Sequence, residues 1–165
     1  QRISKSSNIT EALGSVDEIN SFLGIIKTNA RAGEVRIPDG RTYAEIMNLA
    51  QQNLFIVQAE LAGADKKISE DKILDEEKIV DEIEKALPPI KTFFVSGGTE
   101  LAALCDFART MVRRAERRVV AAYEEKEEEI DENTLRYMNR LSSLFYALAR
   151  YSNHASGIPE EAPRY

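Results

Sequence analysis

The stretch 101–119, LAALCDFARTMVRRAERRV, decides the fold. Its apolar side chains recur at intervals of three and four residues, at Leu101, Leu104, Ala108, Met111, Ala115 and Val119. An α-helix has about 3.6 residues per turn, so this spacing places these side chains on one face of a long helix. Arginines occupy much of the remaining surface. The stretch therefore predicts an amphipathic helix whose apolar face must be covered by other helices.

Similar apolar stripes run through most of the chain, over residues 9–26, 43–61, 76–87 and 135–148. Asn8 with Glu11 is the expected cap of the first helix, Gly63 the end of the second, and Pro88 the end of the third. The segment 93–98 is the only one that resembles a strand or loop, and no second strand is available to pair with it. We therefore predict an all-α fold in one domain over residues 1–165, a five-helix up-down bundle of ferritin-like type without a sheet.

Composition excludes several classes of function. The chain has 165 residues, 28 carboxylates against 22 Lys and Arg, and a net charge of −6, which argues against a nucleic-acid partner. A single cysteine, Cys105, and a single histidine, His154, rule out the common zinc sites, a histidine-based triad and the di-iron motif of helical bundles. Cys105 is expected to be a small buried side chain and His154 a cap of the last helix. With neither a membrane-spanning run nor a signal-peptide pattern, we expect a cytoplasmic protein.

One row of charges on the 101–119 helix could carry chemistry. At about 100° per residue, Arg109, Arg113, Glu116 and Arg117 fall on one face. Guanidinium groups four residues apart repel one another unless an anion lies among them, and they bind phosphates through paired hydrogen bonds. A solvated basic face is the alternative, and the pattern alone favours it slightly. By the same measure, Asp17 is an ordinary surface carboxylate, Asn139 a polar helix edge, and Ser-Gly-Gly at 96–98 a turn into a helix.

Four sequence blocks, taken together and in this order, favour a functional role for the arginine row over a solvated basic face. They are RISK at 2–5 with EALGSVDEIN at 11–20, QNLF at 52–55 with AELA at 59–62, FFVSGG at 93–98 with ARTMVRRAERR at 108–118, and NRLS at 139–142 with LARY at 148–151. In these blocks the chain resembles the PduO-type ATP:cob(I)alamin adenosyltransferases. The combination of the arginine block with Asn-Arg-Leu-Ser is highly specific, and the blocks cover nearly the whole chain.

The resemblance implies an enzyme that transfers the 5′-deoxyadenosyl group of ATP to the Co(I) of a reduced corrinoid, giving adenosylcobalamin and triphosphate. It implies a homotrimer with active sites between neighbouring subunits, and Mg²⁺ carried by the ATP phosphates without a metal site of the protein's own. A reductase and an adenosylcobalamin-dependent enzyme are the implied partners. The alternatives are a non-catalytic bundle that binds and delivers adenosylcobalamin, and a helical scaffold whose arginines meet an acidic protein.

The resemblance also implies individual roles. Catalytic roles fall to Arg113 and to Arg109, which pairs with an aspartate of the adjoining subunit, for which Asp17 is the candidate. The implied corrinoid contact is Phe93, against the lower face of the ring. The positions implied to bind ATP are Lys5, Glu116, Arg117 and Asn139.

The sequence departs from the family pattern in two respects. Family members carry a Gly- and Thr-rich segment that helps hold the triphosphate, and the sequence begins after it; residues 1–165 alone are expected to bind ATP weakly. Many members have His where Asp106 stands and Asp where Ser143 stands. We assign neither position to the chemistry and expect activity to survive both changes.

Overall fold

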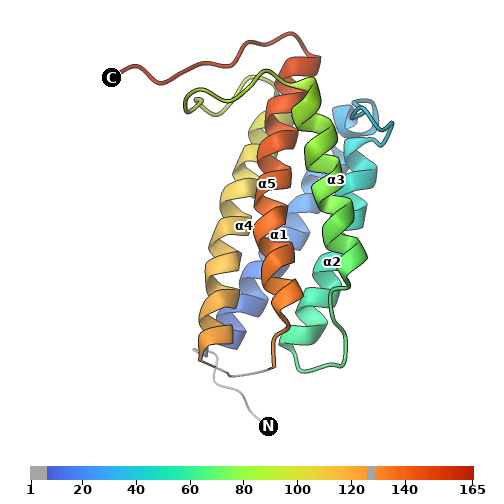
Figure 1. Ribbon diagram of the computed structural model, residues 1–165, viewed down its shortest axis with the longest axis vertical. Helices are drawn as coiled ribbons and strands as arrows, with labels where there is room; N and C mark the ends of the chain where they lie inside the picture. Colours follow the sequence, from blue (N-terminus) through green and yellow to red (C-terminus); the bar gives the residue numbers. More distant parts are fainter. Residues whose placement is uncertain (1–6, 126–128) are drawn as a thin grey trace.

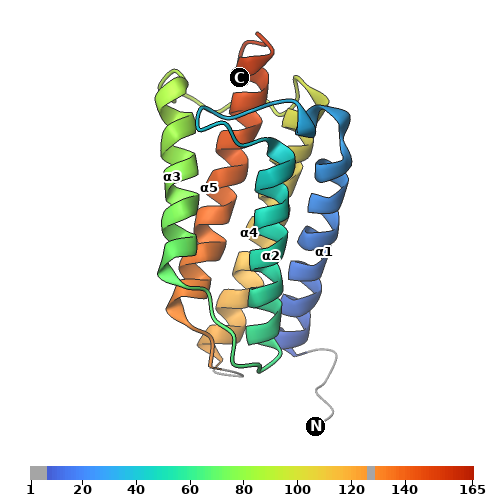
Figure 2. The same ribbon diagram turned by 90° about the vertical axis from the view of Figure 1, so that its right-hand side faces the viewer.

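The computed structural model describes residues 7–125 and 129–165, which form five α-helices that run up and down along one long axis (Figures 1 and 2). The elements are α1 (Asn8–Thr28), the 3-10 helix η1 (Ala30–Gly33), α2 (Tyr43–Leu61), α3 (Glu70–Ala86), α4 (Glu100–Glu124) and α5 (Glu132–Ala155). An isolated bridge between Arg36 and Thr42 is the only extended pairing in this part of the chain. The prediction of a five-helix fold without a sheet is confirmed. None of the described helices is long and apolar enough to cross a bilayer.

Two helix starts differ from the prediction. The cap of α1 is Ser7, one residue earlier than expected, and its hydroxyl accepts a hydrogen bond from the Thr10 amide (3.2 Å). Helix α3 begins at Glu70, six residues before the expected start at Glu76. The stretch before Glu76 reads as a charged connector, but acidic residues are favourable in the first turn of a helix, where they face its positive end. Ile73 then already belongs to the buried side of α3.

The apolar face of α4 is a heptad seam of small residues. Its fully covered positions alternate in steps of four and three: Leu101, Cys105, Ala108, Val112, Ala115, Val119 and Ala122. Leu104 and Met111, expected in the core, are only half-buried at its edge, so Cys105 and Val112 take those places. Small side chains let α4 lie close against α1 and α5. Cys105 is buried as predicted, and burial raises the pKa of its thiol.

A buried carboxylate from α2 caps the start of α5. Glu60 accepts hydrogen bonds from the Asp131 amide (2.7 Å) and from the Thr134 hydroxyl. Its negative charge faces the positive end of the α5 dipole, where a carboxylate is favourable. This contact fixes the end of the bundle opposite the pocket described below.

Glu76 on α3 is a second buried carboxylate, and no backbone amide or helix end in the described part of the chain stabilises its charge as at Glu60. It is 3% exposed, and its side-chain oxygens make no hydrogen bond of regular geometry among the described residues; the nearby hydroxyl of the buried Tyr137 is the weakest of the influences on its pKa. Burial raises its pKa well above the ordinary value of 4.5, and the nearby carboxylates of Asp75 and Glu77 add to the effect. As pH rises past 4.5 the unfolded chain loses this proton while the folded chain keeps it, so folding becomes less favourable.

We therefore expect Glu76→Gln to stabilise the protein at pH 7.5, by about 1–3 kcal/mol. The gain should shrink toward zero near pH 4, where both states hold the proton. Urea unfolding at the two pH values, at one protein concentration, measures the difference. Glu84→Gln on the exposed side of α3 is the control and should show no such pH-dependent gain. A Glu76→Gln variant that is less stable at pH 7.5 would contradict the burial argument.

Candidate functional site

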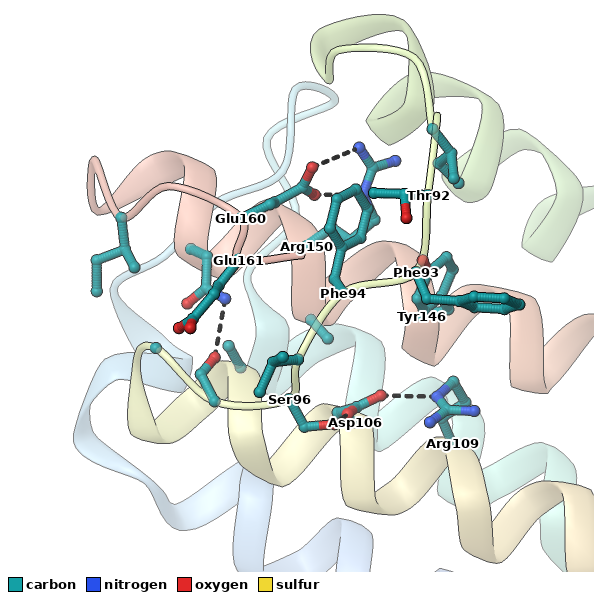
Figure 3. Close-up of a pocket in the computed structure, with 18 of the residues that line it drawn as sticks. Thr92, Phe93, Phe94, Ser96, Asp106, Arg109, Tyr146, Arg150, Glu160 and Glu161 are labelled. Carbon is teal, nitrogen blue, oxygen red and sulfur yellow. Dashed lines mark hydrogen bonds and ion pairs between the residues drawn. The ribbon is translucent and has the colours of Figure 1, made fainter. Parts of the chain in front are cut away.

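A pocket of about 1040 Å³ opens at one end of the bundle (Figure 3). Its walls are the 87–99 loop between α3 and α4, the facing sides of α4 and α5, and the segment that follows α5. Both helices thus contribute side chains along a shared groove, while two non-helical segments close its end.

The 87–99 loop owes its shape to two glycines and one asparagine. Gly97 and Gly98 have φ values of +129° and +92°, in a region that favours glycine. The Asn153 side chain donates to the Gly97 carbonyl (2.9 Å) and accepts from the Thr99 amide (2.9 Å). Thr99 in turn caps α4. The Ser-Gly-Gly sequence is therefore a turn into a helix, as predicted, and it is pinned to the end of α5.

The loop carries an apolar wall. Phe93 is 79% exposed although it lines the pocket, and Ile90 and Val95 are also exposed. Phe94 is half-buried against the Arg150 guanidinium, whose central carbon lies 5.4 Å from the ring centre. Large apolar side chains that stay exposed beside a cavity suit a bulky ligand with an apolar surface. The predicted position of Phe93 at a binding surface thus has a cavity beside it.

The arginines of α4 divide into two groups. Arg114 and Arg118 turn toward α1, where they pair with Glu18 and with Glu11 (3.8 Å). These two fit the alternative of a solvated basic face. Arg109 and Arg113 line the pocket instead. Within residues 7–125 and 129–165, neither Arg113 nor Arg117 forms an ion pair, so both guanidinium groups can receive an anionic ligand.

Arg109 is held from two sides. Its Nε donates to Asp106 Oδ1 (2.7 Å), and its guanidinium carbon lies 6.0 Å from the centre of the Tyr146 ring. Burial raises the pKa of Tyr146, whereas the charge of Arg150 works in the opposite direction. The tyrosine therefore stays neutral near pH 7 and presents a hydroxyl group to the pocket.

Two further predicted residues meet just outside the lining. The Asn139 side chain on α5 donates to Glu116 on α4 (2.9 Å). Glu116 lies about one helical turn beyond Arg113. Arg117 is exposed next to them and also lies outside the lining. The contact between Glu116 and Asn139 thus joins α4 to α5 just beyond the pocket, on the side of Arg113.

Of the remaining two predicted residues, the structure describes only Asp17, which does not line this pocket. Asp17 is exposed on α1, where it accepts a hydrogen bond from the Gln58 side chain (3.3 Å). One chain by itself therefore does not bring Asp17 to Arg109. Lys5 lies outside the described residues.

Sequence reasoning missed several residues of the pocket. Asp106 and Ser143, which were noted but assigned no role, both line it. Arg150 is only 6% exposed, forms a paired contact with Glu160, and donates to the Pro88 carbonyl (2.8 Å). An arginine among the apolar residues of the last helix was the one sequence signal for this contact, because such a charge requires a partner.

The geometry joins an apolar wall to a row of cations. Aromatic and aliphatic side chains from the loop face one end of the groove, and the guanidinium groups of Arg109 and Arg113 line the other, that of Arg113 without an ion-pair partner among the described residues. Such a site can hold a flat apolar ring next to a polyphosphate. No three His, Cys, Asp or Glu side chains of the described residues lie together as a metal site.

Comparison with known proteins agrees with this geometry. Residues 1–152 match the family described as cobalamin adenosyltransferase. The chain is 40% identical over 161 residues to the corrinoid adenosyltransferase of Bacillus subtilis, covering 95% of this chain and 80% of the relative. It is 34% identical to the corrinoid adenosyltransferase PduO of Citrobacter freundii, with 93% of this chain covered but only 45% of that longer protein.

A solved structure extends the similarity to three dimensions. It is a variant of the PduO-type ATP:corrinoid adenosyltransferase from Lactobacillus reuteri in complex with cobalamin and ATP. The two folds superpose with a TM-score of 0.86 at 31% sequence identity, covering 99% of this chain and 88% of the other. The similarity thus includes all five helices, the 87–99 loop and the segment after α5.

Proposed function

This chain belongs to the cobalamin adenosyltransferase family, and we propose that the pocket between α4, α5 and the 87–99 loop is its active site. As a member of that family it is an enzyme, which uses ATP to adenosylate a corrinoid. The observation that carries the assignment to this pocket is the meeting of the exposed Phe93 wall with Arg109 and Arg113 in one cavity.

The reaction makes limited demands on the protein. The electron pair of Co(I) attacks the 5′-carbon of ATP, a cobalt–carbon bond forms, and the carbon–oxygen bond breaks. Triphosphate leaves with the electron pair of that bond. Because Co(I) is a strong nucleophile, the attack needs little acid–base help, which fits a chain with one histidine, His154, exposed outside the pocket lining. The protein must align the two substrates and stabilise the charge on the leaving group.

We assign the leaving triphosphate to the polar half of the groove. The free guanidinium groups of Arg113 and Arg117 support this role, because no carboxylate of the described residues neutralises them by an ion pair. Glu116 and Asn139 hold each other beside them (2.9 Å) and complete the nucleotide side. Lys5 contributes a further positive charge in this proposal, and Mg²⁺ comes with the phosphates.

The corrinoid belongs at the apolar half. Phe93 would lie against the lower face of the ring and keep water and the lower ligand away from cobalt. A cob(II)alamin without its lower ligand is easier to reduce, because the orbital that accepts the electron is lower in energy. The high exposure of Phe93 beside the cavity supports this role, since the side chain can be covered only by a ligand or a partner.

We further propose that three copies assemble and that each active site lies between two of them. Asp17 of one subunit would then pair with Arg109 of the next, whose terminal nitrogens form no ion pair with any of the described residues. An apolar patch on α1 and α4 supports an interface here. Phe107 and Ile25 are each 57% exposed, and the Phe107 ring meets the Phe22 ring edge to face with centroids 5.2 Å apart.

The patch gives a test of assembly. Replacing Phe107 by Glu puts a charge into a surface that the trimer would bury, and we expect the assembly to weaken by about fivefold to a hundredfold, at a cost of about 1–3 kcal/mol. Native mass spectrometry across a dilution series measures it. Leu74→Glu, which changes an equally exposed leucine on α3, is the control (53% exposed). A wild type that stays a single chain with ATP bound would contradict the interface.

The activity itself is tested with reduced cobalamin and Mg-ATP. The expected product is light-sensitive, has the spectrum of a cobalt–carbon bond, and forms together with triphosphate. Tight binding of finished adenosylcobalamin without turnover would favour a delivery protein instead. Failure to bind either ATP or a corrinoid would favour a scaffold. The reductase, the enzyme that consumes the product, and a cytoplasmic location stay predictions from the sequence.

A further inference from the structure

Asp106 occupies a junction in the pocket wall. It lies on α4 between the apolar and the cationic halves, and its side chain is 14% exposed. One carboxylate oxygen accepts from Arg109 Nε (2.7 Å), and the other accepts from the Ser96 hydroxyl in the 87–99 loop (Figure 3). A single carboxylate thus holds one residue from each half of the site.

Ser96 and Phe93 belong to the same short loop, so a contact at Ser96 also constrains the aromatic wall. Asn153 and Arg150 hold this loop to α5, through the Gly97 and Pro88 carbonyl oxygens. Among the described residues, the hydrogen bond from Ser96 to Asp106 is the one by which a side chain of segment 88–98 reaches α4. Asp106 therefore supplies the side-chain contact that joins the wall to the arginines of α4, while the Val95 amide holds the wall to the segment after α5 by donating to the Glu161 carbonyl (2.7 Å).

The other oxygen sets the direction of Arg109. With Nε bound to Asp106 and the guanidinium near the face of Tyr146, the two terminal nitrogens are left for other partners. Without the carboxylate, the long side chain would regain its rotamer freedom. It would also approach Arg113, one turn further along α4, without the Asp106 carboxylate beside it to offset the repulsion.

We propose that Asp106 is a positioning residue that sets the corrinoid wall and Arg109 at a fixed separation. This role rests on the proposed function, because it matters only if the two substrates react across that separation. Transfer requires cobalt, the 5′-carbon and the leaving oxygen in line, and a misplacement of about 1 Å can lower a rate by about a hundredfold. Each substrate still has its own contacts in its own half of the site. Loss of Asp106 therefore slows the reaction more than it weakens either binding step.

The experiment compares Asp106→Ala, Asp106→Asn, Ser96→Ala and the double variant Ser96→Ala with Asp106→Ala, in the full chain. We expect Asp106→Ala to lower kcat by about tenfold to a hundredfold, with KM for ATP and for cob(I)alamin each changed less than threefold. Asparagine keeps an acceptor for Arg109 and a partner for Ser96, so it should retain most of kcat. Ser96→Ala should have a smaller effect, and it should add nothing once Asp106 is gone.

The matched control is Glu70→Ala. It also removes a carboxylate that pairs with an arginine, Arg136, on the outer side of α3 and α5 (2.7 Å). Its kcat should equal that of the wild type. An unchanged kcat in Asp106→Ala, beside an active wild type, would overturn the proposal. Equal losses in the Asn and Ala variants would also overturn it, in favour of charge alone. An inactive wild type would instead reject the proposed function.

Discussion

Arg113→Ala is expected to lower kcat for adenosyl transfer by a factor of about 10²–10³, a loss of about 2.7–4 kcal/mol of transition-state stabilisation. The reason lies in the charge that develops as triphosphate leaves. Arg113 lines the pocket, is exposed, and forms no ion pair within the described residues. Its guanidinium is therefore free in the resting protein and gains its partner only from the nucleotide. An interaction that strengthens as the bond breaks affects kcat more than KM.

Stopped-flow absorbance under single-turnover conditions separates this step from product release. Arg113→Lys keeps the charge but not the paired hydrogen bonds, so its rate should lie between those of the wild type and the Ala variant. Arg136→Ala serves as the control, because Arg136 is an exposed arginine of α5 that pairs with Glu70 outside the pocket. Its rate should match the wild type. Full turnover by Arg113→Ala would remove Arg113 from the catalytic role.

The helices of this fold were predictable because their signal is local. The apolar spacing of 101–119 lies within one helix. It predicts which face of that helix is buried even when the helices that cover it are not known. The start of α3 was missed because Glu70 and Asp71 look like connector residues until Ile73 is known to be buried. Similarly, the sequence around Glu60 does not indicate that this residue caps α5, because the first residues of α5 lie about 70 positions further along the chain.

The residues of the candidate site also fall into those that local sequence predicts and those that it does not. Arg109, Arg113 and Phe93, which line the candidate pocket, were predicted because a charge row and a family motif mark them in the sequence. Asp106 and Arg150 were not, because their roles come from contacts with Ser96 and Glu160 that exist only once the chain has folded. A contact between Asp17 and Arg109 would need a second copy of the chain. No pattern within one sequence reports that geometry without a family resemblance.

Gly98→Ala is expected to damage the pocket by displacing the 87–99 loop. A Cβ at this position would lie 2.2 Å from Asn153 Oδ1 and 2.7 Å from Asn153 Cγ, far inside normal contact. The backbone also has a φ of +92°, which strains any residue with a Cβ. Asn153 must therefore move and give up its bonds to Gly97 and Thr99 (both 2.9 Å). Strain of about 1–3 kcal/mol and two lost hydrogen bonds of about 1 kcal/mol each should lower the free energy of unfolding.

The displacement of the loop should weaken the binding of the corrinoid more than the binding of ATP. Because Phe93 moves with the loop, KM for cob(I)alamin is expected to rise tenfold or more, while ATP binding, measured by calorimetry, changes little. Gly157→Ala is the matched control, since its φ is +69° but its added Cβ meets nothing within 4 Å. The difference between the two variants isolates the collision with Asn153. In Gly98→Ala combined with Asn153→Ala the collision is gone, so the two losses should not add. If they do add, or if Gly98→Ala behaves like Gly157→Ala, Asn153 does not set the loop.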